Sequence, residues 1–390
     1  MKICQIGTGA EPVSENSTRA VEIVIYNLSK ELAELGNEVH IIDMIGGRKN
    51  KKLKYHLVNL PFLKAGLKEA RGFPRLIKKI TFSIKPFLLL LKLQKRERFD
   101  IVHVQNQFPG FLILLFKKLL KVNGVYTSHI PFWTLNRDRF SKKLLFKTFL
   151  ERICLKKADK VIAVSQAQKD GILEKVKIRP GKIQVIQNGV DLKKFYPKKK
   201  EDKEKIVLYA ARLCREKNQF LIIKAIPEIV KKEKKEKVKF LFIGQIEDKD
   251  YFEEIMKFIR KNKIEEYVEI LGSVDNKSMA GHYRNADIFL SSSNVEGFPL
   301  TALEAMASGC AMVLSKIKPH SEIEKNGEII YFEPDNLKDL IEKLNLLVGD
   351  RNKIKKFSKK ALDSAKKFYS WKKVASKNME IYSRVKEPFL

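Results

Sequence analysis

Two glutamates, Glu296 and Glu304, bracket a short turn-prone segment that runs into an apolar stretch typical of a helix. Gly297 permits close approach of the backbone to a ligand, and Pro299 suits the first turn of that helix. The free N–H groups at the helix start would favour an anion. Because two carboxylates near one cavity can also accept hydrogen bonds from hydroxyl groups, the segment predicts a site for a ligand that carries both phosphates and hydroxyls, as a sugar nucleotide does.

A simpler interpretation has to be weighed against this one. An acid ahead of a helix often only complements the helix dipole, and an acid inside a helix usually lies on a solvated face. The residues that follow Glu304 argue against this simpler interpretation. The small and apolar residues from Ala305 to Val313, with Gly309 as a helix stop, predict a helix packed closely on a parallel sheet. With this continuation, the segment resembles the signature of the retaining, nucleotide-sugar-dependent glycosyltransferases of family 4, which have the GT-B fold.

A second polar site follows the predicted strand Ile206 to Tyr209. Arg212 at the strand end and Lys217 at the start of the next helix are close enough in sequence for both to reach one diphosphate. Strand ends also commonly carry basic residues that are merely exposed. The motif of the family has Arg and Lys at the matching positions, so the resemblance implies that Arg212 and Lys217 bind the phosphates of the donor.

The resemblance carries over to further residues. A lone histidine at a strand end is more often structural than catalytic, but His129 matches a family residue that projects near the transferred sugar. The resemblance also places Val274 beside the nucleobase and Glu304 on the ribose, and Glu296 on the sugar hydroxyls. The implied catalytic set is His129, Arg212, Lys217 and Glu296, and the implied donor-binding set is Arg19, Arg212, Lys217, Val274, Glu296, Gly297, Phe298, Pro299, Leu300 and Glu304.

One departure from the family pattern lies before the first helix. Members usually have two glycines there, which let the backbone approach the donor phosphate, whereas this chain has Arg19 and Ala20. Two interpretations stay open. Either Arg19 joins the groups that bind phosphate, or the loop from Gly7 to Thr18 is rearranged.

Candidate strands and amphipathic helices alternate twice along the chain, which predicts two parallel sheets covered by helices. We expect an α/β protein of two doubly wound, Rossmann-like domains that face each other across a cleft, with the ligand near the carboxyl ends of the strands. Residues 1–190 would form the amino-terminal, acceptor-side domain, and residues 191–370 the nucleotide-sugar-binding domain. A helix in residues 371–390 would pack back on the first domain. The polar run Lys198 to Lys203 is typical of a linker.

The individual elements can be placed from hydrophobic patterning. The clearest helix spans Thr18 to Leu35 and is ended by Gly36. The expected strands are Ile3 to Ile6, Glu38 to Asp43, Ile101 to Val104, Val125 to Ser128, Lys160 to Val164, Ile183 to Ile186, Ile206 to Tyr209, Val238 to Ile243, Tyr267 to Leu271, Ala286 to Leu290 and Ala311 to Leu314.

The 390-residue chain has a formal net charge of +32, which raises the question of nucleic acid. Its lysines alternate with glutamates, as in Lys231 to Lys237, a pattern typical of solvated helix faces, so we expect no nucleic-acid partner. The other candidate partner is an anionic membrane. Arg75 to Arg98 and Phe108 to Leu120 combine apolar and basic residues as interfacial helices do, although either could be an ordinary core-facing helix.

The four cysteines are scattered and show no paired spacing, which favours a reducing compartment. We expect neither a signal peptide nor a spanning helix, and therefore a cytoplasmic protein that can lie peripherally on the inner face of the cell membrane. Asp248 and Asp250 have a spacing that binds manganese in a different glycosyltransferase fold, but a helix cap is the more direct interpretation. We expect no metal and no other cofactor.

The resemblance implies a metal-independent hexosyltransferase. It would move a hexose-type sugar from a nucleoside-diphosphate sugar, UDP rather than GDP, to a glycan, glycolipid or lipid-linked saccharide with retention. Front-face displacement needs no protein nucleophile, so the protein would supply alignment and electrostatic stabilisation. Two alternatives remain: a nucleotide-sugar hydrolase or epimerase of the same fold, and a basic membrane or nucleic-acid binding protein with an inactive cleft.

Overall fold

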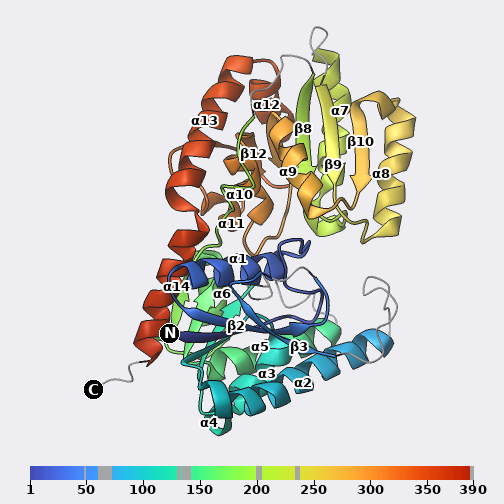
Figure 1. The fold of residues 1–390 in the computed structure, drawn as a ribbon. Helices are drawn as coiled ribbons and strands as arrows, with labels where there is room; N and C mark the ends of the chain where they lie inside the picture. The colour runs from blue at the N-terminus through green and yellow to red at the C-terminus, as the bar shows by residue number, and fades with distance from the viewer. Residues whose placement is uncertain are drawn as a thin grey trace. The chain divides into compact units, whose positions relative to one another are not determined.

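The structure is a computed structural model that describes residues 1–47, 50–59, 73–129, 133, 142–198, 204–232 and 238–386. The chain forms two compact units, shown in Figure 1: unit 1 comprises residues 1–188 and 371–390, and unit 2 comprises residues 189–370. Most of the predicted linker Lys198 to Lys203 lies outside the described residues. The same holds for the two residues after His129, for residues 233–237 of the lysine-rich run and for residues 387–390.

Unit 1 is built on a parallel sheet whose strand order, in the described residues, is β3-β2-β1-β4-β5-β6-β7. Strand order reverses between β1 and β4, because β1 leads outward to β2 and β3 on one side while β4 starts the other side. The strands are β1 Lys2–Ile6, β2 Glu38–Met44, β3 Lys54–Val58, β4 Ile101–Val104, β5 Asn123–Ser128, β6 Lys160–Ala163 and β7 Ile183–Val185.

Helices cover both faces of this sheet. Helix α1 packs on the C-terminal helix α14 on one face, while α2, α3 and α5 lie together on the other (Figure 1). Gly36 ends the first helix as predicted, with a φ of +82° that favours glycine. The helices are α1 Ala20–Glu34, α2 Phe73–Glu97, α3 Gln107–Leu115, α4 Lys117–Leu120, α5 Lys142–Lys157, α6 Gln166–Lys175 and α14 Trp371–Lys386.

Unit 2 has a second parallel sheet, with the order β10-β9-β8-β11-β12-β13 in the described residues. Its strands are β8 Lys205–Ala210, β9 Val238–Ile243, β10 Val268–Gly272, β11 Ile288–Ser291, β12 Ala311–Ser315 and β13 Ile329–Phe332. Its helices are α7 Gln219–Lys232, α8 Lys249–Asn262, α9 Asn276–Asn285, α10 Leu300–Ala307, α11 Lys318–Ser321, α12 Leu337–Val348 and α13 Arg351–Phe368.

The predicted α/β class with two parallel sheets is confirmed, and two strands were missed. The outermost strand β3 reads Lys-Tyr-His-Leu-Val, and its polar residues hide the apolar pattern of a buried strand. The outermost strand β13 has only four residues, Ile329–Phe332. The predicted cap is also confirmed: the Asp248 carboxylate accepts a hydrogen bond of 3.0 Å from the backbone N–H of Tyr251 at the start of α8. Within the described part of the chain, no helix has both the length and the apolar character needed to cross a bilayer.

Candidate functional site

The polar residues predicted for the site lie where the strand order of unit 2 reverses. Strands β8 and β11 are hydrogen-bonded neighbours, but β8 leads to β9 on one side and β11 to β12 on the other. The connections leave in opposite directions, so a crevice is expected at the carboxyl ends of these two strands, and open α/β sheets bind ligands at such a point. The loop after β8 carries Arg212 and Lys217, and the loop after β11 carries Glu296.

Lys217 and Glu296 form an ion pair at this point. Nζ of Lys217 donates to the Glu296 carboxylate, and it lies 3.3 Å from the backbone oxygen of Val295. The two side chains are only 12% and 16% exposed. Burial by itself would raise the pKa of Glu296, but the attraction of Lys217 outweighs it and the pKa of the carboxyl is lowered. The Glu296 carboxyl is therefore ionised at neutral pH.

The backbone of Lys217 is held firmly against both strands. Its carbonyl oxygen accepts hydrogen bonds from the hydroxyl of Tyr209, at 2.6 Å, and from the hydroxyl of Ser292, at 3.2 Å. Asn218, the next residue, has a φ of +51°, which turns the chain sharply into α7. Because Tyr209 is on β8 and Ser292 follows β11, the lysine is positioned by both sides of the reversal point.

His320 is a further residue at this place, and the sequence analysis missed it. The ring is completely buried after β12, and Nδ1 lies 2.8 Å from the carbonyl oxygen of Ser315, so Nδ1 carries the proton. Nε2 is buried and has no hydrogen-bond partner among the described residues. Burial lowers the pKa of His320, although Glu296 opposes this effect. A histidine five residues beyond a buried strand end is the signal that could have found it.

The loop before α10 presents backbone rather than side chains. Phe298, Pro299 and Leu300 are buried, so side-chain contact with a ligand is not what they offer. The backbone N–H groups of Gly297 and Phe298 have no hydrogen-bond partner in the part of the chain that is described. Glu304 lies on the second turn of α10, and burial raises its pKa to about 7.

Two other predicted residues of unit 2 lie apart from the ion pair. Arg212 is 57% exposed, and its guanidinium pairs with Glu247 beyond β9. Val274 is half-buried at the carboxyl end of β10, two strands from β8 in the sheet order. All of the predicted residues of unit 2 therefore lie at or beyond strand ends on one edge of the sheet or in α10, and the Lys217–Glu296 ion pair links the loop after β8 to the loop after β11.

In unit 1, His129 ends a buried chain of hydrogen bonds. Its Nε2 lies 2.8 Å from the side-chain oxygen of Gln105, and Gln105 donates to Gln5 at 3.1 Å. His103 continues the network, with Nδ1 at 2.7 Å from the hydroxyl of Tyr382 on α14. An amide oxygen only accepts, so Nε2 of His129 carries the proton and Nδ1 stays an acceptor. Burial lowers the pKa of His129 to about 3, so the ring is neutral at physiological pH.

The structure bears on the two interpretations of Arg19. The Glu11 carboxylate accepts hydrogen bonds from the backbone N–H groups of Thr18, at 2.5 Å, and of Arg19, at 2.7 Å. The Glu11 carboxylate of the loop thus already lies at the amino-terminal end of α1, where a helix favours an anion. The side chain of Arg19 is exposed. This geometry favours a rearranged loop.

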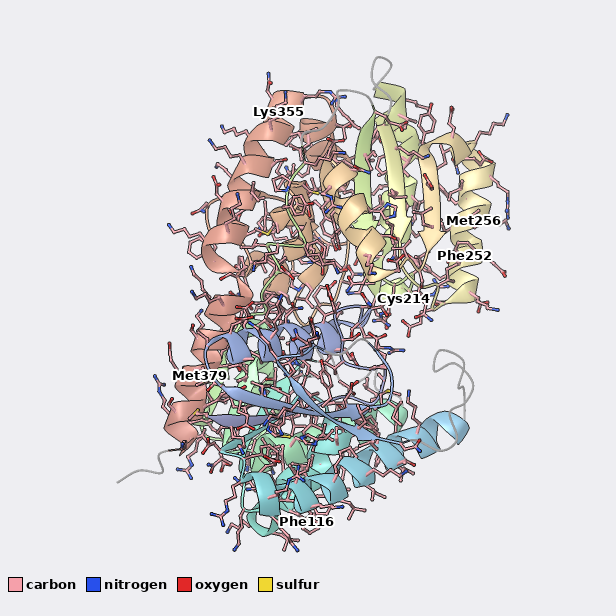
Figure 2. All side chains as sticks on the ribbon, in the orientation of Figure 1. Phe116, Cys214, Phe252, Met256, Lys355 and Met379 are labelled. Atoms are coloured by element: carbon pink, nitrogen blue, oxygen red, sulfur yellow. The ribbon has the colours of Figure 1, made fainter. Side chains whose placement is uncertain are left out.

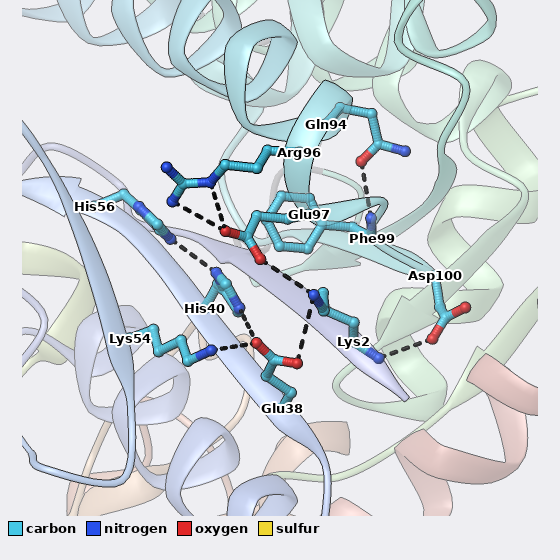
Figure 3. Close-up of polar contacts among 10 residues, drawn as sticks. All are labelled: Lys2, Glu38, His40, Lys54, His56, Gln94, Arg96, Glu97, Phe99 and Asp100. Carbon is cyan, nitrogen blue, oxygen red and sulfur yellow. Dashed lines mark hydrogen bonds and ion pairs between the residues drawn. The ribbon is translucent and has the colours of Figure 1, made fainter.

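One group of histidine and acidic side chains in the described residues has the spacing of metal ligands: Glu38, His40 and Glu97, shown in Figure 3. Nζ of Lys2 lies 3.1 Å from Glu97 and 3.5 Å from Glu38, and Lys54 also pairs with Glu38. These ammonium groups already supply the positive charge that the carboxylates attract. The group starts at the amino ends of β1 to β3, opposite to the strand ends discussed above, and we interpret it as an ion-pair network.

Comparison with known proteins agrees with this geometry. Residues 21–194 match the family model Glycosyltransferase Family 4, and residues 192–363 match the model Glycosyl transferases group 1. The chain belongs to glycosyltransferase family 4. It is 27% identical over 383 residues to the phosphatidylinositol N-acetylglucosaminyltransferase GPI3 subunit of Saccharomyces cerevisiae, which covers 94% of this chain and 80% of that protein.

Solved structures show that this family 4 glycosyltransferase has the GT-B fold. Sucrose-phosphate synthase from Thermosynechococcus elongatus superposes with a TM-score of 0.80 at 18% identity, covering 98% of each chain. Anabaena HepE, solved in complex with UDP and glucose, gives a TM-score of 0.74 at 18% identity and covers 98% of this chain and 99% of its own.

Proposed function

We propose that this glycosyltransferase binds a nucleoside-diphosphate sugar, UDP in preference to GDP, and transfers a hexose-type sugar with retention and without a metal ion. The observation that carries the proposal is the buried Lys217–Glu296 pair at the reversal point of the unit 2 sheet. The unpaired N–H groups of Gly297 and Phe298 lie in the same loop as the carboxylate. A cation, an acid and free amide donors are together the groups that phosphates and sugar hydroxyls require.

Each group then has a role in binding the donor. Lys217 and Arg212 bind the diphosphate, and each exchanges an internal carboxylate partner, Glu296 or Glu247, for a phosphate oxygen. Glu296, released from the lysine, accepts hydrogen bonds from the sugar hydroxyls together with the Gly297 and Phe298 amides. Glu304 accepts from the ribose, and Val274 lies against the base. Arg19 stays outside this set, because Glu11 occupies the helix end beside it.

The chemistry needs no nucleophile from the protein. The acceptor hydroxyl attacks on the face from which the diphosphate leaves, and its proton passes to a leaving phosphate oxygen. Negative charge grows on that phosphate, where Lys217 and Arg212 stabilise it. His129 orients the sugar as a neutral ring, because its pKa of about 3 leaves Nδ1 free to accept a hydrogen bond.

We propose a glycan, a glycolipid or a lipid-linked saccharide as the acceptor, reached by a cytoplasmic protein in peripheral contact with an anionic membrane. The yeast relative is named for transfer of N-acetylglucosamine to phosphatidylinositol, which supports a lipid acceptor. The complex of the Anabaena protein with UDP supports uracil as the base.

Thermal unfolding against a panel of uridine and guanosine diphosphate sugars tests the donor. A ligand that binds only the folded state raises the melting temperature, so one uridine diphosphate sugar should stabilise the protein in buffer containing EDTA. Lys217→Ala should lose this stabilisation, and Lys355→Ala on α13 should keep it. Products from that donor should retain the anomeric configuration by NMR. Release of free sugar without any glycosylated product would instead support a hydrolase.

A further inference from the structure

Helix α2 of unit 1 presents a stripe of apolar side chains to solvent. Ile80, Ile84 and Leu88 follow one another at intervals of four residues and are 51%, 44% and 55% exposed. Residues at this spacing lie on one face of a helix. The opposite face of α2 contributes Phe82 and Leu90 to the core. The core of the unit therefore does not account for the exposed stripe.

The neighbouring helices repeat this arrangement. On α4, Leu119 is 65% exposed, and on α5, Phe146 and Phe149 are 54% and 57% exposed. On the same two helices, Leu120 of α4 and Leu150 and Cys154 of α5 are buried. In each case the helix is anchored to the unit by one apolar face and keeps a second one on the outside.

These faces belong to one surface. Helix α3 packs between α2 and α5, and the three helices form a single layer on one side of the sheet of unit 1 (Figure 1). The rings of Phe87 on α2 and Phe116, between α3 and α4, lie 5.8 Å apart and join α2 to the α3–α4 segment. Figure 2 shows Phe116 at the outer side of the layer. An extended exposed apolar patch of this kind marks an interaction site.

The charged residues of this layer are nearly all basic. The segments 73–97, 107–121 and 142–157 contain two acidic residues, Glu97 and Glu151, in a chain that has 46. Neither offers negative charge to a partner, because Glu97 pairs with Lys2 and Glu151 is completely buried and bonded to Ser128 at 2.5 Å. Exposed basic side chains stand among the apolar ones, with Lys92 on α2, Lys118 on α4 and Lys156 on α5.

We propose that the outer surface of α2, α3–α4 and α5 docks on an anionic lipid bilayer. Large apolar side chains surrounded by lysines suit the boundary between acyl chains and negatively charged headgroups. A second copy of the chain fits poorly, because it would bring lysines against lysines. Nucleic acid would leave the aliphatic stripe of α2 unused. The inference rests on the proposed function in one respect, since it assumes an acceptor carried by the membrane.

Sedimentation with vesicles tests the proposal. The full-length protein should bind vesicles of phosphatidylcholine with phosphatidylglycerol and remain unbound with phosphatidylcholine alone. The charge variant Lys92→Glu/Lys118→Glu/Lys156→Glu should lower the partition coefficient about a hundredfold, since each lysine near an anionic surface adds about one kcal/mol. The apolar variant Leu88→Ser/Leu119→Ser/Phe149→Ser should lower it by at least about tenfold.

Matched controls lie on unit 2. Lys355→Glu/Lys359→Glu changes exposed lysines of α13, where Figure 2 labels Lys355, and Leu346→Ser changes a leucine that is 42% exposed on α12. Both controls should bind vesicles as the unmodified protein does. All variants should keep the stabilisation by the uridine diphosphate sugar, which shows that they are folded.

Three outcomes would overturn the inference. The surface variants could bind anionic vesicles as well as the controls do, or they could abolish a dimer detected by ultracentrifugation, or they could abolish salt-dependent RNA binding while vesicle binding is absent. In each case an intact donor-dependent thermal shift would leave the proposed donor site standing. Loss of that shift in the unmodified protein would instead remove the proposed function.

Discussion

The Lys217 ammonium bonds to the Glu296 carboxylate where the strand order of unit 2 reverses. Removing two charges from water is costly, and a buried pair is weak evidence of a stabilising role. Strands β8 and β11 already pair through their backbones, and their apolar side chains share one core. Apolar residues at these two positions could therefore stabilise the fold as well as the ion pair does. The two charges fit a ligand site in which Lys217 and Glu296 pair with each other until the donor binds.

Breaking this pair from one side should damage both stability and activity. Lys217→Ala leaves the Glu296 carboxylate largely buried without its partner, and we expect a loss of about 3 kcal/mol in the free energy of unfolding. Transfer should fall by about a hundredfold to a thousandfold, because a donor aimed at the developing phosphate charge is lost. Urea unfolding and a transfer assay measure the two effects.

The double variant Lys217→Ala/Glu296→Gln separates these effects. It removes the unpaired charge, so it should regain part of the lost stability and none of the lost activity. Equal stability of the single and double variants would contradict the view that the carboxylate is left uncompensated.

Arg212 should behave differently, because its pair with Glu247 is exposed. An exposed ion pair contributes about 0–1 kcal/mol, so Arg212→Ala should leave the free energy of unfolding almost unchanged. Transfer should nearly disappear, as one of the two cations on the diphosphate is missing. Arg215→Ala is the matched control, since Arg215 is equally exposed and pairs with Glu254. Similar activity of the two variants would exclude Arg212 from the donor site.

The sequence was sufficient for the two parallel sheets and for the Gly36 and Asp248 helix ends. It could not reveal Lys217 and Glu296 as partners, because 79 residues separate them and only the adjacency of β8 and β11 brings them together. His320 was missed for a related reason: its burial and its unpaired Nε2 depend on the packing around β12.

A second limit of the sequence concerns the roles of Phe298, Pro299 and Leu300. The motif marked them as donor-binding positions, but a motif does not distinguish a side chain that touches a ligand from one that fixes the loop. Their burial indicates that they place the Gly297 and Phe298 amides. The sequence could not reveal the hydrogen bond of Glu11 at the start of α1 either, because that bond depends on how the loop from Gly7 to Thr18 folds back.

Glu304 makes stability depend on pH in a predictable direction. Burial raises its pKa from 4.5 to about 7, so the folded protein binds more protons than the unfolded chain between these values. Stability is therefore lost as the pH rises from 4.5 to 7. Glu304→Gln removes this loss and should be more stable than the unmodified protein at pH 8, on the order of 1–3 kcal/mol, with the difference vanishing near pH 4. Melting curves of both proteins across this range measure the difference, and a constant difference would contradict the assignment.

Gln105 should act on the reaction through His129 without touching the donor. Gln105→Met removes the oxygen that accepts from Nε2 of His129 and the amide that donates to Gln5, so the ring loses the bond that fixes its tautomer and orientation. We expect slower transfer with unchanged stabilisation by the uridine diphosphate sugar. Gln105→Glu keeps an acceptor oxygen and should restore part of the rate.

Because the pKa of His129 is about 3, the pH profiles of the unmodified protein and of His129→Ala should be parallel between pH 5 and 9. A limb that disappears in His129→Ala would show that the ring titrates, and the neutral orienting role would be wrong.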